Sequence, residues 1–314
     1  MQAVSYSNSQ SEVWDAFVRT SRNATFLHVR SYMDYHSDRF ADASLLFYDE
    51  KCRLQGLLPA NVDLSTQTAW SHQGLTYGGL LLADDTRYET VREMLDAACL
   101  HYKKMGLQHF VYKCIPAIYS RYHSEEDLYW LYRKGATLTA RSLSSCITLD
   151  GALPFSTLRG RKLHAAERAG LTVSVSEEWG DFWELLSGVL RDRHGVRPVH
   201  TLGEITLLHS RFPGQIVLYA VKDSGAMLGG CVVYDTGRVA HVQYIAASEA
   251  GRKVGALDLL FYDVIQTYKD RGVPYFDFGI STESGGTVLN EGLLFQKEGF
   301  GGRGVVYDTY HIAL

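Results

Sequence analysis

The stretch that decides the fold runs from Gln215 to Phe278 and reads QIVLYAVKDSGAMLGGCVVYDTGRVAHVQYIAASEAGRKVGALDLLFYDVIQTYKDRGVPYFDF. It begins with three apolar runs rich in β-branched residues, separated by the turns Asp-Ser-Gly and Asp-Thr-Gly. Short apolar runs punctuated by such turns are typical of an antiparallel meander. The predicted strands are residues 215–222, 227–234 and 238–245.

A helix and a fourth strand follow the meander. Ser248 is a suitable N-cap, and beyond it apolar residues recur every three or four positions as far as Tyr268. Gly272 ends this helix, and a further strand begins at Tyr275. The order strand, strand, strand, helix, strand predicts an α/β fold with a mixed sheet and helices on both faces.

The first half of the chain repeats this order. Residues 44–48 and 53–59 form a candidate hairpin, and a helix follows a predicted capping box of Thr86 and Glu89. That helix stops at Gly106, and a strand follows.

A short internal alignment supports the repeat. Residues 102–110 align with residues 268–276, with Tyr, Lys, Gly and Phe at matching positions. We therefore predict two tandem units, residues 1–150 and residues 151–314.

Composition excludes several classes of protein. Hydrophobic residues make up 46% of the 314, enough for packed cores, so extended disorder is excluded. Lys plus Arg number 31 against 35 Asp plus Glu, a net charge of -4 that argues against a dedicated duplex-DNA binder. The five cysteines are widely spread and form no Cys-x-x-Cys pair, and neither a signal peptide nor a membrane-spanning stretch is visible. A soluble, cytoplasmic protein is expected.

The strongest candidate for ligand binding is the turn that opens the helix after Ser248. A Gly-containing turn into a helix leaves backbone N–H groups unpaired, and Arg252 and Lys253 add positive charge, so a pyrophosphate would suit it. The alternative is a plain tight turn. A second basic stretch, residues 153–170, either touches phosphates or is the solvated face of a helix.

The run from Tyr244 to Gly302 resembles the acyl-CoA-binding core of the GNAT N-acetyltransferase superfamily, specifically its Fem-like branch. That branch includes enzymes that build peptidoglycan interpeptide bridges. The segments that carry the resemblance are Arg-Lys-Val-Gly-Ala-Leu at 252–257, Asp-Phe-Gly at 277–279 and NEGLLFQKEGFGG at 290–302.

The resemblance implies an acetyl-CoA or other acyl-CoA donor, with strand residues 242–246 donating backbone N–H groups to the thioester oxygen. The implied donor-binding residues are Tyr244, Ile245, Ala246, Arg252, Lys253, Val254, Gly255, Ala256 and Asn290. Two positions depart from the family pattern. Leu257 stands where the phosphate loop has Gly or Ala, and Phe295 stands where a tyrosine acid is common.

Acyl transfer to an amine requires a base for the amine and an acid for the departing thiolate. Glu283, Asp277 and His241 are candidate bases near predicted strand ends, and Glu283 is favoured because it lies in a Gly/Ser-rich loop. Tyr310 and Tyr307 are candidate acids, although alternation along a strand makes one of them ordinary core.

A polar cluster in the first half is a candidate acceptor site. A metal site is not expected at His36, because its two-residue spacing from Asp34 and Asp38 fits metal ligation poorly. The acceptor-binding candidates are Asp38, Arg39, His72 and Tyr77. The alternative is that these residues cap loop backbone beside turn glycines.

The leading hypothesis is an N-acyltransferase in which the second unit binds the donor and the first shapes the pocket for a small-molecule amine. An amino sugar, an amino acid and a cell-wall precursor are the acceptors considered. Nucleic acid is not expected as a partner except in one alternative, a Fem-type transfer from aminoacyl-tRNA. A further alternative is a non-catalytic tandem unit that binds a ligand or partner. No metal is expected.

Overall fold

The computed structural model describes residues 1–314, apart from the side chains of Arg193 and His194. The chain forms two compact units. Unit 1 comprises Met1–Ser142, Glu283–Val288 and Val306–Leu314, and unit 2 comprises Leu143–Thr282 and Leu289–Val305. These units differ from a single division at residue 150, because the end of the chain returns to unit 1. Strands β9 (Thr137–Thr148) and β17 (Arg303–Ala313) therefore each begin in one unit and end in the other.

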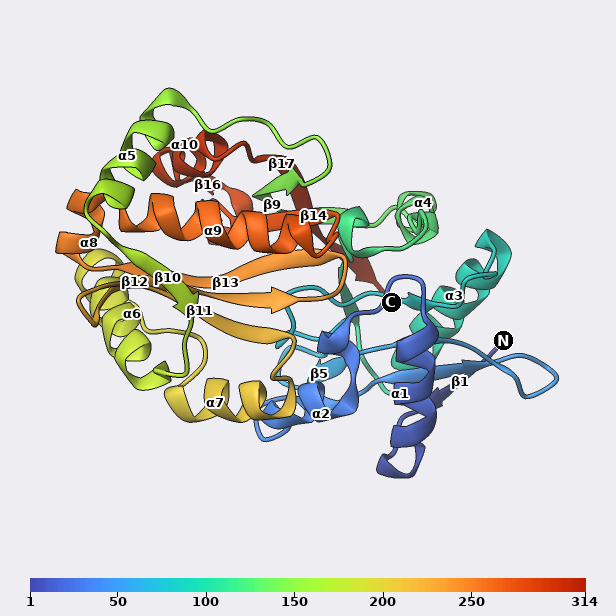
Figure 1. Ribbon diagram of the computed structural model, residues 1–314. Helices are drawn as coiled ribbons and strands as arrows, with labels where there is room; N and C mark the ends of the chain where they lie inside the picture. Colours follow the sequence, from blue (N-terminus) through green and yellow to red (C-terminus); the bar gives the residue numbers. More distant parts are fainter. The chain divides into compact units, whose positions relative to one another are not determined.

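Unit 2 contains the predicted meander followed by a helix and a parallel strand (Figure 1). Its strands are β10 (Thr172–Val175), β11 (Ile216–Asp223), β12 (Ala226–Asp235), β13 (Val239–Ala247) and β14 (Tyr275–Ile280). The strands from β10 to β13 are antiparallel neighbours, and β14 runs parallel to β13. The mixed sheet predicted from the sequence is confirmed.

Helices cover both faces of the unit 2 sheet (Figure 1). Its helices are α5 (Thr157–Arg168), α6 (Trp179–His194), α7 (Leu202–Arg211), α8 (Glu249–Val254), α9 (Ala256–Asp270) and α10 (Glu291–Gly299). Helix α9 packs against β11, β12 and helix α5. Helix α6 packs against β12 and β13.

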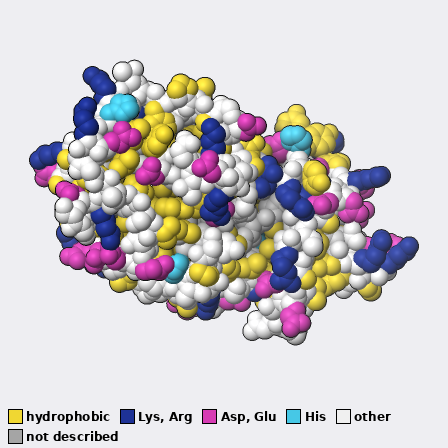
Figure 2. All heavy atoms as spheres, in the orientation of Figure 1, with side chains coloured by type: hydrophobic (Ala, Val, Ile, Leu, Met, Phe, Trp, Pro, Cys, Tyr) yellow, Lys and Arg dark blue, Asp and Glu magenta, His cyan; other side chains and the backbone are white. Residues whose placement is uncertain are grey.

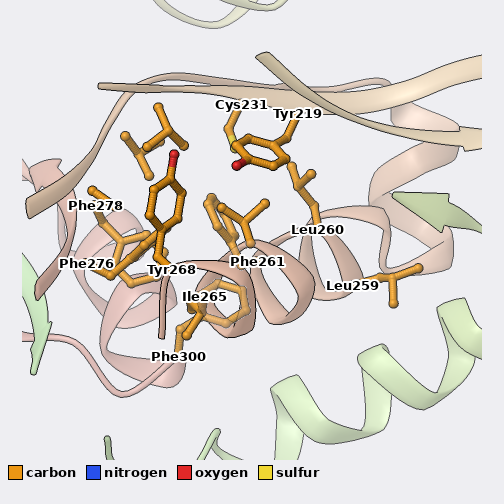
Figure 3. Packing of buried hydrophobic residues seen from close by; sticks show 14 of the residues in the cluster. Tyr219, Cys231, Leu259, Leu260, Phe261, Ile265, Tyr268, Phe276, Phe278 and Phe300 are labelled. Carbon is orange, nitrogen blue, oxygen red and sulfur yellow. The ribbon is translucent and has the colours of Figure 1, made fainter. Parts of the chain in front are cut away.

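Aromatic rings fill the core between α9 and the sheet (Figure 3). The ring of Phe261 lies 5.0 Å from that of Phe278 and 5.2 Å from that of Phe300, measured between centroids. Full burial of one such side chain stabilises the fold by roughly 1.5–3 kcal/mol. The apolar spacing predicted for the helix therefore corresponds to its buried face, which also includes Val264 and Tyr268.

Strands β13 and β14 separate partway along their length. Their pairing runs from Val239 opposite Tyr275 to His241 opposite Asp277. A register shift beside Gln243 gives β13 an extra residue against β12, to which it stays paired as far as Ala247. A bulge increases local twist and bends the strand. The end of β13 therefore diverges from β14, which leaves backbone of residues 242–246 unpaired on that side.

Unit 1 likewise has antiparallel strands followed by a long helix and a further strand, but it has more strands and divides them differently. Strands β1 (Gln2–Ser5), β3 (Leu45–Tyr48), β4 (Leu54–Leu58) and β7 (Leu81–Leu82) form one antiparallel sheet. Strands β2 (Ala41–Asp42), β5 (Asn61–Asp63), β6 (Thr68–Trp70) and β8 (His109–Lys113) join the unit 1 part of β17. Strands β6 and β8 are parallel, as β13 and β14 are in unit 2.

The helices of unit 1 are α1 (Ser11–Thr20), α2 (Arg30–Met33), α3 (Tyr88–Lys104) and α4 (Glu126–Arg133). The predicted capping box of Thr86 and Glu89 is wrong: Arg87 is the N-cap of α3, and the Glu89 carboxylate pairs with Arg92 one turn later. Short 3-10 helices span Asn8–Gln10, Phe26–His28, Asp34–His36, Ala117–Tyr119 and Ser284–Gly286, and β15 (Thr282–Glu283) pairs with β16 (Val288–Leu289).

Among the helices that the structure describes, none is both long enough and apolar enough to cross a membrane.

Candidate functional site

The turn between β13 and α9 is built around two glycines that no larger residue could replace without movement. The Ser248 hydroxyl caps α8 by accepting a hydrogen bond from the Gly251 N–H at 3.0 Å, as predicted. Gly255 has a φ of 80° and divides the predicted continuous helix into α8 and α9. A Cβ added at Gly251 would lie 2.3 Å from the Leu228 carbonyl oxygen. One at Gly255 would lie 2.6 Å from the Lys162 carbonyl oxygen.

A pocket of about 380 Å³ lies at this turn, beside the diverging end of β13. One part of its lining is apolar, supplied by Val189, Leu190, Ile245, Ala246, Leu257 and Leu293. Another part is basic, supplied by Arg159, Lys162 and Arg252, with Asp258 as the acidic residue of the lining. Such a pocket suits a ligand with an apolar portion and an anionic group.

One of these cations already has a buried partner. The Arg159 guanidinium donates to the Asp258 carboxylate at 2.9 Å and lies over the Phe300 ring, 5.2 Å from its centroid. Burial raises the pKa of Asp258, and the charge of Arg159 opposes that rise. This pair joins α5 to α9 and forms one wall of the pocket.

The predicted donor-binding residues divide into two groups. Ile245, Ala246, Arg252 and Gly255 line the pocket, and Arg252 is fixed there because it donates to the Ala247 carbonyl at 2.6 Å. Lys253 is exposed and pairs with Glu249 at 2.7 Å.

The other predicted donor residues serve the fold through their side chains. Ala256 is buried in the core, and Val254 packs against it. Tyr244 lies on the α6 face of β13, where its hydroxyl contacts His200 Nδ1 at 2.5 Å, so it could contribute to the pocket only through its backbone. Asn290 caps α10 by accepting from the Leu293 N–H at 3.0 Å.

The two departures from the family pattern have different structural consequences. Leu257 contributes to the pocket lining and also packs against the core of unit 2, so it narrows the pocket. The Phe295 side chain is 66% exposed, while its neighbours Leu293 and Gln296 line the pocket.

A buried chain of polar groups lies where β13 and β14 part. His241 Nδ1 is 2.8 Å from Asp277 Oδ2, and Ser144 donates to the other carboxylate oxygen at 2.5 Å. Asp277 is fully buried and His241 is 8% exposed. A carboxylate in this position orients the imidazole, which is the geometry that a histidine general base requires.

Lys297 lies near this chain and was not among the sequence-based candidates. Its ammonium donates to the Gly279 and Ile280 carbonyls, both at 2.8 Å. Burial lowers its pKa to about 8, and Asp277 opposes this. These two hydrogen bonds join α10 to the last two residues of β14. The place of Lys297 in the Lys-x-Gly-Phe-Gly segment was the signal that could have singled it out.

The other two catalytic candidates lie in unit 1. Glu283 is exposed on β15. Tyr310 lies on β17, where burial raises the pKa of its hydroxyl. The Tyr307 hydroxyl is 2.8 Å from that of Tyr119.

Of the acceptor candidates, two are exposed and two are buried. Asp38 and Arg39 lie at the surface, with 3.9 Å between their closest charged atoms. Tyr77 is 1% exposed and donates to the Thr25 hydroxyl at 3.1 Å, so its side chain belongs to the interior of unit 1. His72 is buried against His36. Within the part of the chain that the structure describes, no group of three metal-ligating side chains is assembled.

The basic stretch on α5 has two faces. Arg159 and Lys162, three positions apart, line the pocket, whereas Arg161 and Arg168 are exposed. The pocket-facing pair therefore fits the interpretation as a phosphate contact, and the exposed pair fits the interpretation as a solvated helix face. The three-residue spacing was the available signal for the pocket-facing pair.

An acidic groove adjoins the pocket. It encloses about 570 Å³ and shares Val189, Ala247 and Arg252 with the pocket. Four carboxylates line it, from Asp181, Glu184, Asp192 and Glu249. On the face drawn in Figure 2, Lys and Arg side chains are interspersed with Asp and Glu.

Residues 156–285 match the family described as acetyltransferase (GNAT) domain. No curated protein sequence matches the chain. Among solved structures, FemX has a TM-score of 0.70 at 14% identity, with 100% of this chain and 98% of that chain covered. L-PGS from Bacillus licheniformis has a TM-score of 0.63 at 15% identity, covering 96% and 91%. A tandem GNAT protein from the clavulanic acid biosynthesis pathway has a TM-score of 0.55 at 12% identity, covering 99% and 98%.

Residues 156–285 therefore resemble a GNAT acetyltransferase domain, and the whole chain has a fold similar to those of FemX and the tandem GNAT protein. The pocket, the glycine-constrained turn and the parted strands all lie within unit 2, largely inside the matched segment.

Proposed function

We propose that this protein is an N-acyltransferase that moves an acyl group, acetyl in the simplest case, from acyl-CoA to the amine of a small molecule. The observation that supports this most strongly is the pocket at the diverging end of β13, with its apolar lining and its three basic residues. The apolar part suits a pantetheine arm, and Lys162 and Arg252 suit phosphates. Backbone N–H groups of residues 242–246 would polarise the thioester carbonyl.

In the proposed reaction, the neutral amine attacks the thioester carbon, a C–N bond forms and the C–S bond breaks. The amine proton passes to a base, and the thiolate takes a proton from an acid or from water. His241 is the base with a visible orienting partner, Asp277, while Glu283 and Tyr310 remain proposals for base and acid.

The test is transfer of labelled acetyl from acetyl-CoA to a panel of amino sugars, amino acids and cell-wall precursors. His241→Gln, Glu283→Gln and Tyr310→Phe are compared with the unaltered protein for turnover and for donor affinity. If the residue is the base, its substitution lowers turnover far more than donor affinity. The substitution also removes the limb of the pH–rate profile that arises from titration of that base. Equal losses in turnover and affinity would contradict that role for the residue concerned.

The second candidate is Fem-type transfer from aminoacyl-tRNA, which the resemblance of the 290–302 segment to the Fem-like ending favours. The net charge of -4 counts against it, because a tRNA presents a long polyanionic surface to the protein. Binding of labelled tRNA that falls steeply with salt would support this candidate. Acyl-CoA binding without turnover across the amine panel would instead support a non-catalytic role.

A further inference from the structure

Unit 1 contains a second cavity, of about 210 Å³, that the proposed donor site does not use. It lies among α2, the 3-10 helix Asp34–His36 and the backbone around residue 72. The side chains that matter for its chemistry are those of Arg30, Asp34, His36, Phe40, Asp42 and His72.

Two histidines form a wall of this cavity. The imidazoles of His36 and His72 stack with 5.1 Å between centroids and 17° between planes, and the residues are only 1% and 4% exposed. Nδ1 of each is buried without a hydrogen-bond partner among the residues that the structure describes. The other nitrogen of His36, Nε2, lies 3.4 Å from the Gly74 carbonyl oxygen. Buried polar atoms are normally satisfied, so an unpaired Nδ1 on each of two stacked rings points to a ligand or to a rearrangement that a ligand completes.

The backbone around the cavity is specialised to hold these rings. His72 has a φ of 65°, in the left-handed region that residues other than glycine adopt uncommonly, with Asn, Asp and His the most frequent among them. A Cβ at Gly74 would lie 2.3 Å from His36 Nε2, so the ring occupies space that only glycine leaves open. Strained backbone of this kind concentrates at ligand-binding sites.

The charges around the cavity select among ligands. Arg30 Nη2 donates to both Asp34 and Asp42, and its guanidinium stacks 3.7 Å from the centre of the Tyr6 ring. The side chains of Asp34 and Asp42 remain 42% and 36% exposed, so their oxygens can still accept hydrogen bonds. Nε and Nη1 of Arg30 are also buried without a partner among the described residues, so they are free to donate to an oxygen of a ligand. Two carboxylates beside one guanidinium still leave a net negative charge, which disfavours an anionic ligand.

Burial lowers the pKa of both histidines, so their rings are neutral near pH 7. A neutral imidazole has one donor and one acceptor, and a carboxylate accepts only. A ligand with several groups that each donate and accept matches this set, and hydroxyl groups have that property. The cavity volume of about 210 Å³ is about seven times the volume of one molecule in liquid water, so the cavity can hold one small ring. The Phe40 ring, 4.9 Å from that of His36, offers an apolar face.

We propose that this cavity binds a single polyhydroxylated sugar ring through His36, His72 and the carboxylates of Asp34 and Asp42. The proposal concerns binding of the ring alone, so it does not rest on the proposed function.

The test is ligand-observed NMR titration of the intact protein, without donor, with glucosamine and glucose. Putrescine supplies ammonium groups without hydroxyls, and inorganic phosphate supplies an anion. The variant is His72→Asn, because Asn tolerates the left-handed backbone. His123→Asn, at an exposed loop position of the same unit, is the matched control.

Both sugars are expected to bind at millimolar concentration, about tenfold more weakly in His72→Asn and unchanged in His123→Asn. Binding of putrescine or phosphate in place of the sugars would overturn the proposal, and so would an absence of sugar binding. A parallel titration with acetyl-CoA separates the two proposals. Sugar binding without acetyl-CoA binding contradicts the proposed function and supports the cavity, whereas acetyl-CoA binding without sugar binding does the reverse.

Discussion

The two units share a frame and differ at the entry to their central helix. Helices α3 and α9 carry buried tyrosines at equivalent positions, Tyr102 and Tyr268, and each ends before a glycine with positive φ. In unit 2 the chain enters α9 through a capped turn with Gly255, and a pocket opens there. In unit 1 the chain enters α3 from an extended Arg87. The two units therefore share the frame around the helix, and they differ in the backbone of the segment that leads into it.

The largest expected effect comes from breaking the pair that forms a wall of the unit 2 pocket. Arg159→Met leaves Asp258 buried without its cation, which should lower the free energy of unfolding by about 3–5 kcal/mol. Arg161→Met, on the exposed face of the same helix, should change it by less than about 0.5 kcal/mol. Denaturant unfolding measures both. Similar effects of the two changes would show that the pair does not anchor α5.

A buried carboxyl in unit 1 should make stability depend on pH. Burial raises the pKa of Asp127 to about 6, while the Tyr112 hydroxyl, which donates to it at 2.7 Å, opposes the rise. The folded state thus holds this proton more tightly than the unfolded state does, and stability falls as pH rises from about 4 through 6. The loss is roughly 3 kcal/mol. Asp127→Asn should remove this component. Unfolding curves with the same pH dependence in both proteins would contradict the assignment.

The entry turn of unit 2 can be tested against a matched glycine. Gly255→Ala and Gly272→Ala each place a side chain at positive φ, at a cost of about 1–2 kcal/mol in stability. Only at Gly255 does the new Cβ meet backbone, 2.6 Å from the Lys162 oxygen, whereas at Gly272 nothing lies within 4 Å. We expect donor affinity to fall at least about tenfold in Gly255→Ala alone. Isothermal titration with acetyl-CoA measures both affinities. Equal affinities of Gly255→Ala and Gly272→Ala would show that the turn does not take part in donor binding.

Local patterns in the sequence carried most of the fold. The meander, its turns and the buried face of α9 follow from residue periodicity, which depends on near neighbours. Two features depend instead on pairing between segments that are distant in the sequence, which periodicity does not encode. One is that β17 runs from unit 2 into unit 1, and the other is that the strands of the first half divide between two sheets.

The candidate site was predictable to a similar degree. Arg252 and Gly255 were found because a helix-opening turn has a local signature. The inward turn of Arg159 and the burial of Tyr77 depend on tertiary packing, as does the orientation of Tyr244 toward α6. A strand residue points to one face or the other with a period of two, so the bulge at Gln243 shifts which residues face the pocket.

The smallest stability effects are expected on the surface of α8. Lys253 is 73% exposed in its pair with Glu249, so Lys253→Ala should alter stability by less than about 0.5 kcal/mol. Arg252, its neighbour, lines the pocket instead. Comparing substitutions of these two adjacent cations therefore distinguishes the effect of a contact in the pocket from the effect of positive charge near the turn.

The most direct test of a donor site in unit 2 is calorimetric titration of the intact protein with acetyl-CoA, repeated with Arg252→Ala and Lys253→Ala. We expect one site per chain with micromolar affinity, at least about tenfold weaker in Arg252→Ala and nearly unchanged in Lys253→Ala. Absence of binding to the unaltered protein, or binding that neither substitution weakens, would contradict a donor site at the entry to α9.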